Sequence, residues 1–282
     1  MILGLTPGFI AGIIILAFIL EYMDSTLGMG YGTTLTPVLL MMGYEPLQIV
    51  PVVLISELIT GISAGFFHHR EGNVNFQPKL IVLSEIKEEL KSFGYIKSFN
   101  RNIPKHLKVA MLLAVCSIVG TVFSIFIAVN IPKFWVKIYI GTVVLMMGII
   151  ITICRNKEFK FSWQKIVGLG LVASFNKGIS GGGYGPLVTS GQILSGVEGK
   201  SAVGITSLAE GLTCAVGIIS YMLMTKTPLD LKIAPFIIIG AVASVPFSAK
   251  SVKKLSEKKL KMAIAAATII LGLWTLKQTI FG

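Results

Sequence analysis

The stretch NKGISGGGYGPLVTSG (176–191) decides how this sequence folds. It holds five glycines between Gly178 and Gly185 and lies between apolar segments. Glycine at this density weakens a helix and exposes backbone polar groups. We therefore predict a break between two helices here, where a chain nearly free of side chains lets another group approach the backbone.

The composition is that of a membrane protein. Of the 282 residues, 54% are hydrophobic and only 13% are charged, whereas soluble domains carry about 25% charged residues. A backbone that crosses a bilayer must satisfy its own hydrogen bonds, which leaves helices and closed barrels. The alternating pattern of barrel strands does not occur in this sequence. The predicted fold class is an all-α integral membrane protein with about ten transmembrane helices.

Two of the predicted helices are too short to cross a bilayer alone. The apolar segments are 7–23, 31–43, 46–67, 107–129, 134–153, 163–176, 184–196, 200–223, 231–250 and 260–280. The segments 31–43 and 184–196 correspond to roughly 20 Å of helix, against a hydrocarbon core of about 30 Å. Each follows a glycine-rich stretch, GMGYG (28–32) or SGGGYG (180–185). They are therefore interpreted as short, broken helices.

An internal repeat relates the two halves of the chain. Shifted by 153 positions, residues 24–60 align with 177–213 without a gap, and ten of the 37 positions are identical. The identical pairs include glycines of both glycine-rich stretches, Tyr31 with Tyr184, and Glu57 with Glu210. Each half holds five apolar segments, and because five is odd, the second half enters the membrane from the opposite side.

The predicted domains are two inverted five-helix repeats, 1–153 and 154–282, with a cytoplasmic insertion at about 79–106. Ten crossings place 19 of the 25 Lys and Arg residues on one side, which the positive-inside rule makes cytoplasmic. We expect a multi-pass protein of the cell membrane with both termini outside. Within the insertion, residues 83–99 have helical spacing and are expected either to lie on the inner membrane surface or to pack on the spans.

The two glycine-rich stretches are expected to meet near the membrane midplane, because their short helices start from opposite sides. A helix N-terminus presents free N–H groups and a partial positive charge, which suits an anion. Broken helices from inverted repeats mark the binding sites of secondary transporters, and close packing of small residues is the alternative. The predicted substrate-binding residues are Gly28, Gly30, Tyr31, Gly32, Lys177, Ser180, Gly181, Gly182, Gly183, Tyr184, Gly185, Thr206 and Ser207.

Glu57 and Glu210 match in the repeat and lie in the middle of apolar segments. A carboxyl group inside a membrane is costly and suits proton carriage, although a hydrogen-bonded structural role is equally compatible with the sequence. Glu210 is the stronger candidate for proton coupling, because Lys177 and the polar run at 205–207 are expected near it.

Other chemistries find little support. The motif GISGG (178–182) matches the serine hydrolase pattern, but that chemistry needs a base, and the three histidines lie at or beyond the ends of spans. The two GYG triplets are similar to a potassium filter, which needs four loops on one side. No metal site and no cofactor are predicted, and Cys116, Cys154 and Cys214 are interpreted as packing residues. The net charge of +12 follows from topology, so nucleic acid is not an expected partner.

The order of several motifs resembles the sulfite exporter TauE/SafE family. These motifs are the glycine-rich stretch, the short helix with Pro37 or Pro186, GFFHHREGNV (65–74), VGITSLAEGLTCAVG (203–217) and the C-terminal segment 237–273. The chain departs from the family pattern at IVPVVLISEL (49–58). The resemblance implies a transporter of sulfite, sulfonates or related sulfur anions.

The predicted function is proton-coupled secondary transport of a small organosulfur anion or sulfite by alternating access, not catalysis. An anion channel without coupling is the alternative. The expected partners are this anion and the lipid bilayer, with a second copy of the chain, forming a homodimer, as a further candidate.

Overall fold

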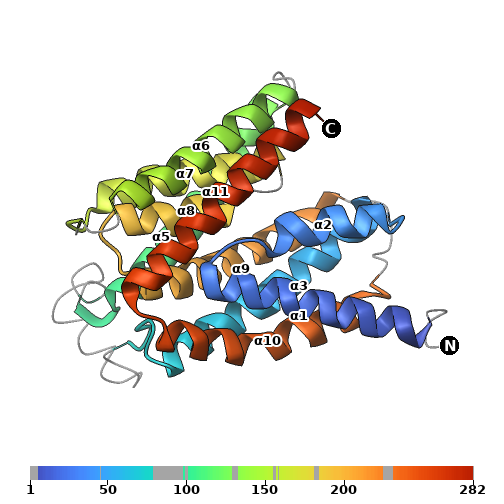
Figure 1. Ribbon diagram of the computed structural model, residues 1–282, viewed down its shortest axis with the longest axis horizontal. Coiled ribbons are helices and arrows are strands. Elements are labelled where there is room, and N and C mark those ends of the chain that lie inside the picture. The colour runs from blue at the N-terminus through green and yellow to red at the C-terminus, as the bar shows by residue number, and fades with distance from the viewer. Residues whose placement is uncertain are drawn as a thin grey trace.

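The computed structural model describes residues 6–44, 46–78, 98, 101–128, 133–154, 157, 159–180, 184–224 and 231–281. These residues form helices joined by turns, with no strand among them, as the sequence predicted. The helices are α1 (Pro7–Leu27), α2 (Tyr31–Met41), α3 (Pro46–Arg70), α5 (Lys105–Ala128), α6 (Lys133–Ile153), α7 (Trp163–Ser180), α8 (Tyr184–Leu194), α9 (Gly199–Met224), α10 (Ala234–Lys254) and α11 (Glu257–Phe281) (Figure 1).

Several of these helices have the length and composition of membrane spans. Within the described residues, five are long and apolar enough to cross a bilayer, namely Pro7–Leu27, Gln48–Arg70, Gly199–Ile219, Ala234–Lys254 and Glu257–Phe281. The predicted helix at 83–99 lies almost entirely outside the described residues. Its contact with the membrane surface stays a prediction.

The short helices α2 and α8 begin at Tyr31 and Tyr184, directly after the glycine-rich stretches, and each has 11 residues. The chain turns at Gly28, which caps α1 with φ 73°, a left-handed conformation that glycine adopts without strain. Several helix boundaries differ from the sequence prediction by up to four residues, and α1, for instance, continues to Leu27 rather than ending at 23. Helix α7 continues to Ser180 rather than ending at 176, since a helix satisfies its own backbone hydrogen bonds where water is absent.

Two of the main helix pairs are antiparallel. In α3 and α9, Gly61 lies against Gly211, and Leu54, earlier in α3, lies against Gly217, later in α9. Glycines allow the α3 and α9 backbones to approach closely, as small residues do in membrane helix packing. Helices α6 and α11 run antiparallel in the same way, with the Gly148–Ile269 and Gly141–Leu276 contacts in reversed order.

The other two main pairs are parallel. Helices α1 and α10 are joined by the Phe18 and Phe247 rings, with centroids 6.1 Å apart, and one turn later by Tyr22 and Ser251. In α5 and α7, Cys116 lies against Gly170 and Gly120 against Ser174. Exchanging the halves, so that α1 replaces α7, α3 replaces α9, α10 replaces α5 and α11 replaces α6, maps all four pairs onto one another.

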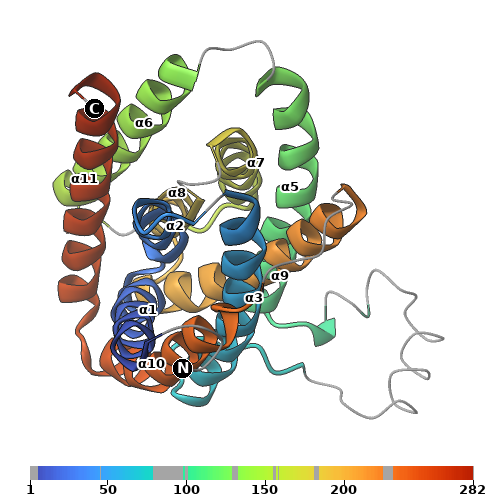
Figure 2. The same ribbon diagram turned by 90° about the vertical axis from the view of Figure 1, so that its right-hand side faces the viewer.

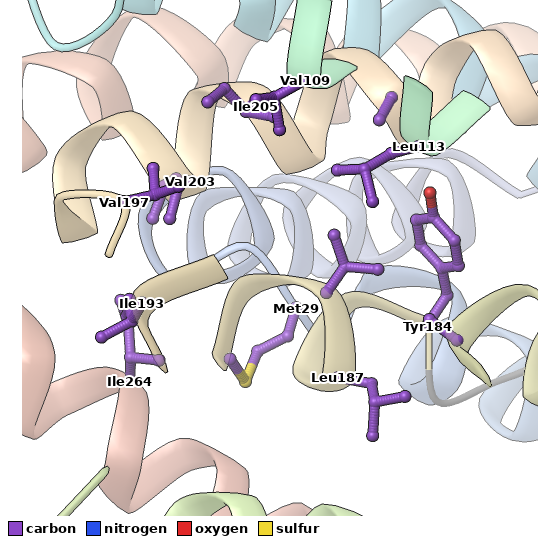
Figure 3. Close-up of a cluster of buried hydrophobic side chains, with 14 of the residues drawn as sticks. Met29, Val109, Leu113, Tyr184, Leu187, Ile193, Val197, Val203, Ile205 and Ile264 are labelled. Carbon is purple, nitrogen blue, oxygen red and sulfur yellow. The ribbon is translucent and has the colours of Figure 1, made fainter. Parts of the chain in front are cut away.

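The short helices lie in the middle of the bundle, with the longer helices around them (Figure 2). One hydrophobic core forms around α2 and includes α1, α3 and α10, and a second forms around α8. Every residue of α8 from Tyr184 to Ile193 is buried. Met29, two residues before α2, belongs to the core around α8 (Figure 3), and its sulfur lies 3.5 Å from the Thr268 hydroxyl oxygen. The first glycine turn therefore reaches across to the second half.

The ends of the chain lie on one side of the bundle. The start of α1 and the end of α11 are close to the same end, and the turn between α10 and α11 lies at the opposite end (Figure 1). This is the arrangement that an even number of crossings produces.

Candidate substrate site at the glycine turns

The first glycine turn, Gly28–Gly30, packs directly on the start of α8. A Cβ atom added at Gly185 would lie 2.6 Å from the Gly28 carbonyl oxygen and 3.0 Å from the Met29 Cα atom. One turn along α8, the Thr189 hydroxyl donates a hydrogen bond of 2.9 Å to the same carbonyl. Two predicted site residues from opposite halves, Gly28 and Gly185, are therefore in backbone contact.

A buried polar chain continues from this contact along α8 and α9. The hydroxyl oxygens of Thr189 and Thr206 are 3.0 Å apart, and Gln192 Nε2 donates to Thr206 over 2.8 Å. Gln192 Oε1 is buried and has no hydrogen-bond partner within the described residues, an arrangement that costs roughly 1–3 kcal/mol. Ser207, also predicted at the site, donates to Val203 in its own helix instead.

The N-terminus of α2 is capped by a carboxylate of the chain itself. The backbone N–H of Tyr31 donates to Asp24 Oδ1 over 3.1 Å, and the buried Tyr31 hydroxyl lies 2.6 Å from Ser56 Oγ. Asp24 thus takes the position that an anion would take at a helix start. In the repeat, the position that matches Asp24 is Lys177, which has the opposite charge.

Glu57 lies beside the first glycine turn. Its Oε1 atom occupies the space that a side chain at Gly32 would need. Its Oε2 atom accepts a hydrogen bond of 3.0 Å from the thiol of Cys214 on α9. Cys214, expected from the sequence to be only a packing residue, is buried and is a polar partner of a site carboxyl group. Glycine at position 32 is thus what allows Glu57 to reach the start of α2.

Sequence reasoning missed another carboxyl group beside the first glycine turn, Glu21. It is 2% exposed and accepts a hydrogen bond of 2.6 Å from Ser25. Thr60, Asp24 and Glu57 are its other polar and charged neighbours. A signal existed, because Glu21 is an acid inside the first apolar segment, but its repeat mate is Ser174, so the repeat did not draw attention to it.

In the second half, the position that matches Glu57 is Glu210, which is half-buried on α9. Ser117 donates to the Tyr184 hydroxyl over 3.1 Å, and Ser174 lies within 3.1 Å of Ser117. The first half thus contributes three carboxyl groups near its glycine turn, whereas hydroxyl groups surround Tyr184. The polar groups beside the first glycine turn therefore differ from those around Tyr184.

Some predicted residues cannot be placed in this geometry. Gly181, Gly182 and Gly183 lie outside the described residues, as do the side chains of Lys177 and Ser180, whose backbone belongs to α7. Gly30 has a φ of 123° and open space beside it. Glu210 is half-buried on α9, one turn before Cys214. Its proximity to Lys177 stays a prediction.

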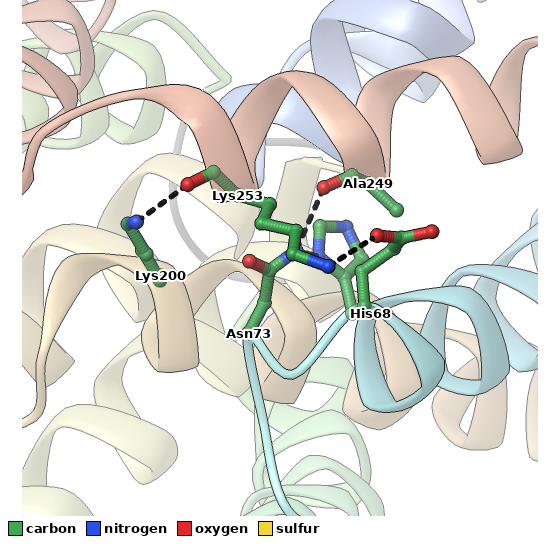
Figure 4. A network of polar contacts seen from close by, with 6 residues as sticks. His68, Asn73, Lys200, Ala249 and Lys253 are labelled. Atoms are coloured by element: carbon green, nitrogen blue, oxygen red, sulfur yellow. Dashed lines mark hydrogen bonds and ion pairs between the residues drawn. The ribbon is translucent and has the colours of Figure 1, made fainter.

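A hydrogen-bond network at the end of α3 fixes the last turn of α1. Asn73 Nδ2 lies 3.1 Å from His68 Nδ1 and donates to the Ala249 carbonyl of α10 over 2.8 Å (Figure 4). Because Asn73 donates to Nδ1, the proton of the buried His68 ring is on Nε2, which donates to the Ser25 carbonyl over 2.9 Å. The helix turn that carries Glu21 and Asp24 is therefore tied to α3 and α10.

The chemistry that the site offers is polar and acid–base. Carboxyl, hydroxyl, amide and thiol groups line it, and in the described part of the chain no group of three or more His, Cys, Asp or Glu side chains could hold a metal ion. A short helix that begins at a glycine turn and packs against the other half of a helical bundle is typical of the broken-helix sites of secondary transporters.

Sequence comparison gives the family. The model of the sulfite exporter TauE/SafE family matches residues 13–84 and 91–275, and the chain belongs to this family. A relative described as the probable membrane transporter protein YtnM, from Bacillus subtilis (strain 168), is 25% identical over 280 residues, covering 94% of this chain and 82% of the relative. No solved structure matches the chain. The family match extends into the segment 79–106 from both sides and omits only 85–90 within it.

Proposed function

We propose that the protein is a secondary active transporter that moves sulfite, a sulfonate or a related organosulfur anion across the cell membrane by alternating access, coupled to protons. Membership of the TauE/SafE family and the relative's description as a probable membrane transporter support membrane transport. The observation that carries the finer proposal is the backbone contact of Gly28 with Gly185, with Glu57 beside it at Gly32.

The directions of the packed helices support ten crossings with inverted halves. In the described part of the chain, four helices lie between α3 and α9, and four lie between α6 and α11. Each crossing reverses the direction of the chain. If α8 did not cross the membrane while the other helices did, the α3–α9 and α6–α11 pairs would be parallel. They are antiparallel, and the parallel α1–α10 and α5–α7 pairs fit the same count. The short helices α2 and α8 are thus interpreted as crossings completed by their glycine turns.

Protons and the anion would bind together for an electrostatic reason. Two like charges about 4 Å apart repel by roughly 4 kcal/mol at an effective dielectric constant of 20. An anion that approaches the glycine turns meets the carboxyl groups of Glu21, Asp24 and Glu57. A proton on one of them lowers this repulsion, so proton binding and anion binding favour each other.

The anion is expected closer to the second glycine turn than to the first. Asp24 already caps α2, whereas the matching position before α8 is Lys177. The polar chain of Thr189, Thr206 and Gln192 lies on the same side of the contact. The first half would then carry the proton, and the second half the substrate.

The substrate class is tested by competition in proteoliposomes. Uptake of labelled sulfite would be measured against an excess of sulfonate, sulfate, chloride or an uncharged sulfone. We expect sulfite and at least one sulfonate to compete and the uncharged sulfone to have no effect. Competition by chloride and sulfate as strong as that by sulfite would favour an unselective anion channel instead.

A further inference from the structure

A shallow groove between α1 and α10 divides into an aromatic part and a basic part. It has a volume of about 440 Å³ and is lined by Phe18, Tyr22, Phe247, Lys250, Ser251 and Lys254. The α10 members follow each other at spacings of three, one and three residues, so they form one face of the helix. The groove therefore runs along the helices, from phenyl rings at one end to two ammonium groups at the other.

The aromatic end faces away from the protein core. Phe247 is 59% exposed, and its ring packs on that of Phe18. Phe247 lies on a helix that is long and apolar enough to cross a bilayer, so its exposed ring is expected to contact lipid chains. Between this pair and the lysines, Tyr22 and Ser251 form a hydrogen bond of 2.8 Å across the two helices, so the floor of the groove is held in place from both sides.

The basic end of the groove carries two exposed lysines. Lys250 and Lys254 are exposed, lie one turn apart on the same face and form no ion pair within the described residues. Like charges at this spacing repel each other. The Glu71 carboxylate forms its ion pair of 3.0 Å with Lys253, and the charge of Lys250 acts on it only from farther away. Both lysines lie at the end of α10 that the positive-inside rule assigns to the cytoplasm.

We propose that this groove binds an anionic phospholipid of the inner leaflet, with the headgroup phosphate between Lys250 and Lys254 and an acyl chain along Phe18 and Phe247. Basic pockets between helices on the cytoplasmic side suit such headgroups. Helix polarity and topology explain why lysines end α10. Helix polarity and topology do not explain why Lys250 and Lys254 line the same groove as the Phe18–Phe247 pair and the Tyr22–Ser251 hydrogen bond. The inference does not depend on the proposed transport function.

The test uses the full-length protein, purified and delipidated in zwitterionic detergent, with bound lipid counted by native mass spectrometry. Phosphatidylglycerol should bind at least fivefold more tightly than phosphatidylcholine. A lysine near an anionic lipid contributes roughly fivefold in affinity, so Lys250→Gln with Lys254→Gln should weaken phosphatidylglycerol binding about 25-fold. The matched pair Lys258→Gln with Lys259→Gln removes the same charge outside the groove and should change binding less than twofold.

Three results would overturn the proposal. They are equal binding of the two lipids, equal losses in the two variant pairs, and displacement of the lipid by inorganic phosphate, which would make the site one for a free anion. A change in the monomer–dimer ratio of the groove variant, with unchanged lipid binding, would assign the groove to a second copy of the chain. If the double variant fails to fold, Lys254→Gln alone should lower the affinity roughly fivefold, and an unchanged affinity contradicts the proposal equally.

Discussion

The Thr189 hydroxyl donates a hydrogen bond of 2.9 Å to the carbonyl oxygen of Gly28, and so joins the short helix of one half to the glycine turn of the other. Gly28 is also the residue at which α1 ends, with φ 73°. A carbonyl released from its own helix at this turn is therefore bound by the opposite half. When one half moves relative to the other, this hydrogen bond must either break or move together with both residues.

The contact at Gly185 is tested by Gly185→Ala. Alanine is favoured over glycine within a helix by roughly 0.5–1 kcal/mol, but its Cβ would lie 2.6 Å from a backbone oxygen. Overpacking of this kind costs roughly 1–3 kcal/mol, so the clash should win. We expect a lower Tm in detergent and reduced uptake in proteoliposomes.

Gly168→Ala is the matched control, because no atom lies within 4 Å of a Cβ at this position of α7. Its Tm should be equal or slightly higher. An unchanged Tm and unchanged transport for Gly185→Ala would mean that the two turns do not need their close approach.

Glu57→Gln tests proton coupling. The amide of glutamine keeps the size of the side chain and can accept the hydrogen bond from Cys214. It cannot take up or release a proton during the transport cycle. We expect substrate exchange between equal anion concentrations to continue, while accumulation driven by a pH gradient is lost. Glu210→Gln, at the matching repeat position, is expected to show a similar loss.

Glu71→Gln provides the comparison for these variants, because Glu71 is paired with Lys253 outside the site. It should keep both exchange and accumulation. Accumulation at the parent rate in both Glu57→Gln and Glu210→Gln would make these glutamates structural.

The ion pair of Glu71 and Lys253 predicts a pH-dependent contribution to stability. The hydrogen bond from Lys253 holds the pKa of the Glu71 carboxyl below its ordinary value. A lowered pKa in the folded state stabilises the protein above the unfolded pKa, and this contribution is lost as the pH falls through the folded pKa. Lys253→Gln should therefore lower the Tm slightly at neutral pH, and the difference should vanish in acid.

An exposed lysine at the start of α11 gives the control for this pair. Lys259→Gln removes the same charge. The Tm difference between this variant and the parent should be nearly independent of pH. A Tm difference for Lys253→Gln that grows in acid would contradict the assignment.

Topology is tested by cysteine labelling. In a background without Cys116, Cys154 and Cys214, Gln278→Cys and Ser256→Cys place exposed thiols near the end of α11 and in the turn between α10 and α11. An impermeant maleimide should label position 278 on intact cells and position 256 only after permeabilisation. Labelling of position 256 on intact cells would reverse the predicted orientation.

Much of the fold could be predicted because its determinants are local. Gly28 allows the left-handed turn, and the apolar lengths set the short helices, which begin at Tyr31 and Tyr184 as expected. The end of α7 could not be predicted from the residues around it. The glycines from Gly178 onward suggested a helix end, but hydrogen bonding inside a bilayer favours continuing the helix.

The candidate site was less predictable because it depends on contacts between helices. Glu57 stood out as an intramembrane acid, but its position against Gly32 follows from how α2 packs on α3. Cys214 gains its role only because α9 crosses α3 at that level. Glu21, like Glu57, is an acid inside an apolar segment, but it has no acidic repeat mate, and its importance emerges from its neighbours Ser25 and Asp24.

The central claim is coupled transport of a sulfur anion, and accumulation measures it most directly. Purified protein in proteoliposomes would be given labelled sulfite under an imposed pH gradient, with the membrane potential clamped. The account predicts that sulfite accumulates above its equilibrium distribution, and that a protonophore abolishes this accumulation. Uptake that only reaches equilibrium with or without the gradient would contradict coupling and assign the protein to the channels.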